Sequence, residues 1–285
     1  MFTLTNVGAI AGGDAFLLVT PGKTALLDSG FSFCAEQMLD NIGEELGRRS
    51  LDYVLLTHSH YDHASGSVYC RRRWPQVQVI GSAHTGLVLT KESARRLMRQ
   101  LNDSAGGEQG VTEYEDLLSE LKIDLVVSDG DIIDLGSMKL RVLELPGHTR
   151  CSIGFYAEKE KLLLGCETIG VPAGTGLVMP CCLVSYADSL QAIERVAKLD
   201  IQFLLLPHIG LLQGDACQQF LVDANYWLAE TRRRVREANA AGKSEADLIQ
   251  LFKDLFYTEL IRQNQPEKAF DLNASYIIPQ MLKDA

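Results

Sequence analysis

Four residues with metal-ligating side chains stand within one six-residue run, and this run constrains the chain more than any other feature. The ligand types are His58, His60, Asp62 and His63, directly after an apolar segment typical of a buried strand. Residues two apart on an extended strand point to the same side, so His58 and His60 can bind one ion. If the chain then bends at Tyr61, Asp62 and His63 approach from another direction and suit a second ion. The run therefore predicts a site for two divalent metal ions.

Histidine is rare in the rest of the chain, which has six in total. His148 follows a Pro-Gly turn after one strand-like segment, and His208 follows Pro207 after another. A side chain at the end of a strand is held by a rigid scaffold and still projects into a site. We therefore predict that His148 and His208 are metal ligands. His84 has no such context and is expected to be structural.

These motifs resemble those of the metallo-β-lactamase superfamily. The family's H-x-H-x-D-H motif matches residues 58–63, its Gly-His-Thr signature matches 147–149, and its early acidic strand end matches 27–30. Its last histidine matches His208, and the resemblance runs from about Ala15 to Gly214. It implies an α/β fold, a four-layer αββα sandwich with the metals at one edge of the paired sheets.

The resemblance also implies how the ligands divide between the two ions. One ion would be held by His58, His60 and His148, and the other by Asp62, His63 and His208.

The bridging residue departs from the family pattern. The family usually bridges its metals with the Asp of a Gly-Asp pair, whereas this chain has Gly165-Cys166-Glu167. Glu167 lies nineteen residues after His148, which is the family's usual spacing, so we predict Glu167 as the bridging ligand. The thiolate of Cys166 is the alternative. A second departure is Pro207–Gly210, where Gly-His-Gly is common.

Metals in such a site lower the pKa of a bound water toward 7 and polarise the oxygen of the scissile group, so no Ser or Cys nucleophile is needed. We expect Asp62 and Glu167 to be catalytic residues as well as ligands. Asp28 either orients a ligating imidazole or caps a turn. Zinc is the expected metal, with iron or manganese as alternatives. The apolar run 170–184 either lines an acyl pocket or is a buried connecting loop.

Charge bears on the substrate class. The formal net charge of −10 would repel a phosphate backbone and argues against nucleic acid as a partner. The clusters at 71–73 and 232–236 are interpreted as solvated helix faces, with an anionic ligand as the alternative. We predict a metal-dependent hydrolase acting on an ester or thioester of a small acyl substrate. The alternatives are a lactonase, a phosphodiesterase or a weakly active regulatory protein. The unusual Glu167 motivates the regulatory alternative. A redox role is disfavoured, because flavodiiron members of the superfamily carry Glu where this chain has His60.

The resemblance implies that residues 1–214 form a metallo-β-lactamase-like catalytic domain, and strand and helix signals alternate along this part of the chain. Residues 215–285 are predicted as a helical cap packed on the same body, similar in layout to the thioesterase-like quinolone-signal response proteins of the superfamily. Within the first domain we expect a helix over 91–101, a glycine-rich break at 106–107 and another helix over 112–121.

No stretch approaches the roughly 18 apolar residues of a membrane span, and the first residues lack a basic segment followed by an apolar core. The seven cysteines are odd in number and form no CxxC pair, which favours reduced thiols. We therefore expect a cytoplasmic protein with no membrane partner. The oligomeric state is left open.

Overall fold

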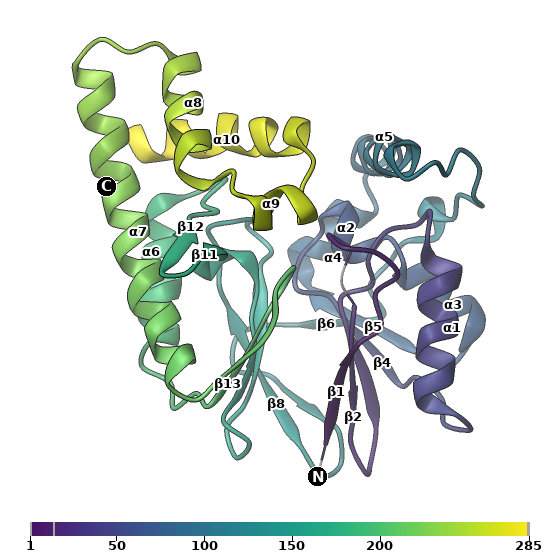
Figure 1. Ribbon diagram of the computed structural model, residues 1–285. Helices are drawn as coiled ribbons and strands as arrows, with labels where there is room; N and C mark the ends of the chain where they lie inside the picture. The colour runs from purple at the N-terminus through teal and green to yellow at the C-terminus, as the bar shows by residue number, and fades with distance from the viewer. Residues whose placement is uncertain (1, 14, 284–285) are drawn as a thin grey trace. The chain divides into compact units, whose positions relative to one another are not determined.

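The computed structural model describes residues 2–13 and 15–283, and the chain forms two compact units (Figure 1). The first unit comprises Met1–Leu143 with Phe155–Lys159. The second comprises Glu144–Gly154 with Glu160–Ala285. Each unit contains strands and helices of its own.

The first unit is built on a mixed sheet whose strands follow one another in sequence order. Antiparallel pairing joins β1 to β2 and β2 to β3, and the remaining neighbours are parallel. Parallel neighbours need crossover connections, which here contain helices. The strands are β1 (Thr3–Asn6), β2 (Phe16–Val19), β3 (Thr24–Leu27), β4 (Tyr53–Leu55), β5 (Gln78–Ser82) and β6 (Leu125–Val127).

The other elements of the first unit include an antiparallel pair, β7 with β8. The elements are β7 (Ile132–Asp134), β8 (Lys139–Glu144), α1 (Ala35–Leu46), α2 (Tyr61–Ala64), α3 (Ser67–Arg73), α4 (Ala83–Leu89), α5 (Glu92–Glu108) and the 3-10 turn η1 (Leu118–Glu120). Strand β9 (Ile153–Ala157) is divided by the boundary between the units.

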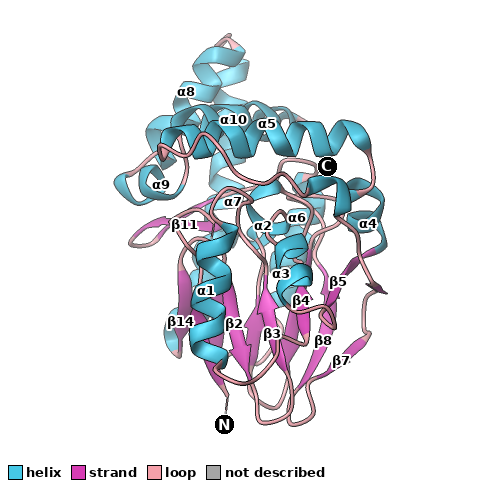
Figure 2. Ribbon diagram, turned by 90° about the vertical axis from the view of Figure 1, so that its right-hand side faces the viewer, coloured by secondary structure: helices cyan, strands magenta, loops and turns pink. Residues whose placement is uncertain are grey.

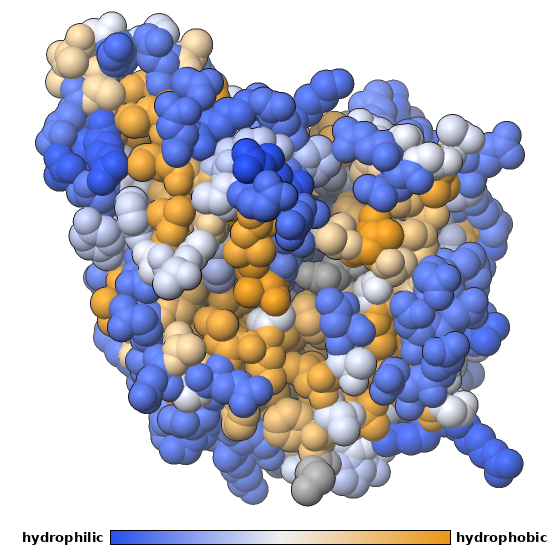
Figure 3. Space-filling view, viewed as in Figure 1, coloured by the Kyte–Doolittle hydropathy of each residue, from blue (hydrophilic) through white to orange (hydrophobic). Residues whose placement is uncertain are grey.

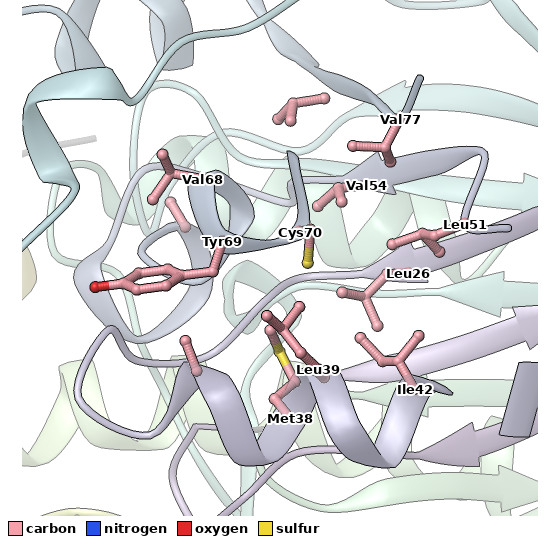
Figure 4. Close-up of a cluster of buried hydrophobic side chains, with 14 of the residues drawn as sticks. Leu26, Met38, Leu39, Ile42, Leu51, Val54, Val68, Tyr69, Cys70 and Val77 are labelled. Atoms are coloured by element: carbon pink, nitrogen blue, oxygen red, sulfur yellow. The ribbon is translucent and has the colours of Figure 1, made fainter. Parts of the chain in front are cut away.

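Helices α1 and α3 lie across one face of the first sheet (Figure 2). Met38, Leu39 and Ile42 of α1 recur at helical spacing and point toward Leu26 and Val54 of the sheet (Figure 4). The outer surface over α1 is largely hydrophilic (Figure 3). The amphipathic sequence of α1 therefore decides which side of the helix meets the sheet.

The residues after β3 are held tightly against α2. The Ser29 amide and hydroxyl both donate to the His63 carbonyl oxygen, at 2.7 and 2.8 Å, and the Gly66 amide donates to the Gly30 carbonyl at 3.2 Å. A Cβ atom on Gly66 would lie only 1.9 Å from the Ser29 carbonyl oxygen. The absence of a side chain at Gly66 is therefore what lets α2 approach the end of β3.

In the second unit, β10 pairs parallel to β13, which pairs antiparallel to β14. Its strands are β10 (Leu162–Leu164), β11 (Val171–Gly174), β12 (Leu177–Met179), β13 (Phe203–Leu206) and β14 (Gly210–Gln213). Its helices are α6 (Tyr186–Val196), α7 (Asp215–Ala240), α8 (Glu245–Phe256), α9 (Glu259–Asn264), α10 (Glu267–Leu282) and the 3-10 turn η2 (Glu167–Ile169).

Helices α7 to α10 confirm the predicted helical C-terminal region and pack on their own unit. The Trp227 indole N–H donates to the Gly176 carbonyl at 2.7 Å, and the Thr258 hydroxyl donates to the Ala173 carbonyl at 2.6 Å. Across the described residues, no helix is long and apolar enough to cross a membrane. The predicted domain boundary at Gly214 stays a prediction.

The expected break at Gly106 and Gly107 is wrong, because α5 continues through both glycines to Glu108. Gly106 is buried, and a Cβ there would lie 3.2 Å from the Phe33 ring and 3.1 Å from the Val111 carbonyl oxygen. Tertiary packing at this small residue offsets the low helix propensity of glycine.

The helix expected over 112–121 is also wrong, since only the short turn η1 forms there. Tertiary contacts hold this stretch in an irregular conformation: the Tyr69 hydroxyl donates to the Glu115 carbonyl, and Arg99 pairs with Asp116. These contacts override the local helical signal.

The run 170–184 contains the hairpin of β11 and β12, which was expected to be a loop. Thr258 and Trp227 bond to this hairpin, and more than half of the run is buried. Both roles considered for the run, an acyl pocket and a connecting segment, stay predictions.

The arginine clusters at 71–73 and 232–236 take part in ion pairs. Arg72 contacts Glu115 and Glu120, and Arg233 contacts Glu230. These pairs favour the helix-face interpretation over an anionic ligand.

Replacing Gly66 by Ala is expected to lower the free energy of unfolding by about 3 kcal/mol, because the new methyl group overlaps the Ser29 carbonyl. Gly107→Ala is the matched control: nothing lies within 4 Å of its added Cβ. Because Gly107 is inside α5, its replacement should raise stability by roughly 0.5–1 kcal/mol. Urea denaturation of both variants measures the difference. Equal effects would contradict the proposed close contact.

Candidate metal centre

The ligand-type residues of the first unit lie where β4 ends and α2 begins, at the upper end of the first sheet in Figure 1. His60 is extended, with φ −69° and ψ 154°, and α2 starts at Tyr61, so the predicted bend is confirmed. The ring centroid of His58 lies 4.5 Å from that of His60 and 4.2 Å from that of His63. The His63 Nε2 atom lies 3.5 Å from Asp62 Oδ2. The four predicted ligands of this run therefore form one compact group.

Asp28 is buried beside this group and contacts one of its imidazoles. The Asp28 Oδ2 atom lies 2.9 Å from His63 Nδ1. A carboxylate accepts a hydrogen bond from the Nδ1–H group, and this contact leaves Nε2 as the metal-binding nitrogen of the ring. Of the two roles considered for Asp28, the contact supports orientation of a ligand.

The second unit holds the other three predicted ligands. His208 Nε2 lies 3.2 Å from Glu167 Oε1. His148 Nδ1 lies 2.9 Å from the Cys181 carbonyl oxygen. A carbonyl oxygen only accepts, so His148 carries its proton on Nδ1 and presents Nε2 as its ligand atom.

Glu167 begins the turn η2 and is only 3% exposed. Its carboxylate makes the contact with His208, which supports Glu167 over Cys166 as the bridging ligand, although the assignment stays a prediction. Burial, and then the negative charge of Glu167, raise the pKa of the Cys181 thiol well above its ordinary value. Cys181 is therefore a neutral neighbour of the carboxylate.

Backbone geometry holds His148 and His208 in place. Gly147 has φ +137°, and a Cβ there would lie 2.2 Å from Ser189 Oγ. The amides of Val184 and Ser185 donate to the Gly147 carbonyl at 3.0 and 3.2 Å. His208 itself has φ +66°, a left-handed conformation that residues other than Gly rarely adopt.

Of the groups that orient these ligands, Asp28 was predicted from the sequence, with orientation as one of its two possible roles, whereas Thr57 and the Cys181 carbonyl were not predicted. The Cys181 carbonyl leaves no sequence signal, because every residue has one. The sequence signal for Thr57 is its position immediately before the ligand run. In the structure its hydroxyl lies 2.9 Å from His58 Nδ1. His84 lies half-buried on α4, and its structural role stays a prediction.

The donor set fits divalent cations of the zinc type. Imidazole nitrogens and carboxylate oxygens are the ligands that zinc, iron and manganese accept in proteins. His63 and His148 each have Nδ1 bound to an oxygen acceptor, the arrangement that prepares Nε2 for a metal.

The fold and these motifs define the class of protein: the chain belongs to the metallo-beta-lactamase superfamily, whose sequence profile matches residues 10–208. It is a metal-dependent hydrolase. The hydroxyacylglutathione hydrolase of Ruegeria pomeroyi is 29% identical over 244 residues, covering 84% of this chain and 79% of the relative. The enzyme of the same name from Acidiphilium cryptum is 27% identical over 275 residues and 96% of each chain.

A solved structure confirms the predicted fold class. The β-lactamase domain protein from Burkholderia ambifaria superposes with a TM-score of 0.67 at 16% identity, covering 99% of this chain and 84% of that one. The α/β metallo-β-lactamase fold with a helical C-terminal region is therefore shown.

Two substitutions of His208 separate backbone strain from the role of the imidazole. Both His208→Gly and His208→Ala remove the ring, but only Gly adopts the φ of +66° without strain. In metal-free protein, the Gly variant should be more stable than the Ala variant by about 1 kcal/mol. Urea denaturation in the presence of a chelator measures this difference. A more stable Ala variant would show that the conformation carries no strain.

Proposed function

We propose that the protein hydrolyses the thioester of a small hydroxyacyl substrate and uses two divalent metal ions, zinc by expectation, as its resident cofactor. The observation that carries the proposal is the pair of oriented ligand groups in a chain aligned with hydroxyacylglutathione hydrolases. The Acidiphilium cryptum relative aligns over 96% of both chains. An acylglutathione is a thioester, so the relatives' name supports this bond as the target.

The proposed ligands are those predicted from sequence. They are His58, His60, Asp62, His63, His148, Glu167 and His208. His58, His60 and His148 are assigned to one ion, and Asp62, His63 and His208 to the other, with Glu167 between them. When bound, such ions lower the pKa of water and polarise the acyl oxygen.

The protein's own carboxylates handle the proton in this proposal. Of Asp62 and Glu167, Asp62 is the more accessible, with a side chain 21% exposed. Asp62 accepts a proton from the attacking water. The water oxygen bonds to the acyl carbon, the carbon–sulfur bond breaks, and the leaving thiolate takes up the proton. Glu167, which is buried, holds its orientation through the contact with His208.

Other substrates and roles rank lower. A lactone undergoes the same attack on an acyl carbon, and a phosphodiester is less favoured by the net charge of −10. A weakly active regulatory protein is the alternative that the Glu at 167 motivates.

The finer sequence predictions also remain proposals. We propose that residues 215–285 cap a catalytic domain of 1–214 and resemble the quinolone-signal response proteins in this respect. We also propose a cytoplasmic location and a small acyl substrate as partner, with no nucleic-acid or membrane partner.

The metal-loaded protein should prefer a hydroxyacyl-glutathione thioester over the lactone of the same hydroxy acid and over a bis-aryl phosphate. We expect a kcat/KM at least about tenfold higher for the thioester and complete loss of hydrolysis with a chelator. Steady-state assays on all three substrates test the ranking.

A pair of histidine variants serves as the control for these assays. His60→Ala should lose at least about 100-fold in kcat/KM, whereas His84→Ala should keep the wild-type value. A preference for the phosphate would overturn the proposed substrate class.

Shortening the bridging carboxylate tests whether Glu167 belongs to an active enzyme. Glu167→Asp should reduce kcat by about 10- to 100-fold, because the carboxylate would retreat by one methylene from His208. Glu167→Gln, which keeps the length and loses the charge, should lose more. A large gain of activity in Glu167→Asp would favour the weakly active regulatory role.

A further inference from the structure

Thr57 joins two members of the first unit's ligand environment through one hydroxyl group. Its Oγ1 atom lies 2.8 Å from Asp28 Oδ2 and 3.1 Å from Asp28 Oδ1. The same Oγ1 lies 2.9 Å from His58 Nδ1. Thr57 and His58 are 0% exposed and Asp28 is 3% exposed, so water does not compete for these contacts.

The donor and acceptor inventory decides where the protons lie in this chain of groups. An ionised carboxylate only accepts hydrogen bonds, so the Thr57 hydroxyl donates its single hydrogen bond to Asp28. Thr57 Oγ1 then accepts, and the only proton that His58 can offer it is the one on Nδ1. This places the proton of His58 on Nδ1 and makes Nε2 the nitrogen that binds a metal.

We infer that Thr57 is a positioning residue for the metal centre. Its hydroxyl links Asp28 to His58 and thereby fixes the tautomer and orientation of the His58 ring. The inference deepens the proposed function and rests on the same metal site. Asp28 orients His63 by direct contact and His58 through Thr57. In the proposed division of ligands, His58 and His63 bind different ions. Asp28 therefore orients one histidine ligand of each ion.

Packing alone does not explain a threonine at this position. A valine has nearly the same shape, whereas a buried hydroxyl is costly unless it is hydrogen-bonded. The Thr57 amide already donates to Asp28 Oδ1 at 2.8 Å, so the main chain is anchored without the side chain. The hydroxyl therefore adds the link to His58.

The tautomer of His58 is measurable in metal-free protein by long-range ¹H–¹⁵N NMR of histidine-labelled samples. A His58→Gln variant assigns the signal among the six histidines. Wild type should show His58 protonated on Nδ1. In Thr57→Val, His58 should lose this single tautomer, while His63, bound directly to Asp28, should keep its own. Thr57→Ser, which retains the hydroxyl, should restore the wild-type signal, and Asp28→Asn should disturb both rings.

Zinc titration against a chromophoric chelator gives a second readout. Thr57→Val should weaken one of the two binding steps by about 10- to 100-fold and leave the other within about twofold, as for other groups that orient a ligand. Thr57→Ser should bind both ions as wild type does.

Several outcomes would overturn the inference. A wild-type His58 protonated on Nε2 contradicts it without any variant, so the test does not depend on the folding of Thr57→Val. Equal defects in the Val and Ser variants would show that the methyl group, and not the hydroxyl, matters. Because the NMR measurement uses neither metal nor substrate, it can succeed even if thioester hydrolysis fails, which separates this inference from the proposed function.

Discussion

The ligand group of the first unit depends on the hydrogen bonds that the buried carboxylate of Asp28 accepts. An unpaired buried carboxylate would be strongly destabilising. Here it accepts from the amide and hydroxyl of Thr57 and from Nδ1 of His63. These bonds connect the end of β3 to the end of β4 and to α2. The same contacts that satisfy the carboxylate therefore fix the elements that carry the predicted ligands.

In each unit, an oxygen atom lies within hydrogen-bond distance of Nδ1 of a predicted ligand histidine. A side-chain oxygen binds Nδ1 of His58 and of His63, and a backbone carbonyl binds Nδ1 of His148. Left-handed backbone conformations occur at Asp28 and His208, with φ of +53° and +66°. Such conformations cost free energy and persist where surrounding contacts determine them. Strain at these two positions is consistent with a site whose geometry takes precedence over local stability.

The sequence singled out candidate ligands because metal chemistry restricts both residue type and spacing. Strand ends could be recognised from apolar runs, which led to His148 and His208. Asp28 could be recognised as a possible orienting group, but the others could not: the Cys181 carbonyl belongs to the main chain, and the role of Thr57 needs its distances from Asp28 and His58. The wrong predictions at 106–107 and 112–121 also reflect information that lies outside the local sequence. In both places tertiary contacts overrode the local preference of the residues.

The glutamate at position 167 gains its significance from the rigidity around it. Gly147 fits against Ser189 with no room for a side chain, and this holds the chain that presents His148. His208 is fixed by its own backbone conformation and contacts Glu167 at 3.2 Å. Glu has one more methylene than the Asp expected from the resemblance. If Glu167 bridges two ions as proposed, this extra length would be taken up within η2 or in the separation of the ions, and Glu167 would then be where this chain differs in activity from relatives that use Asp.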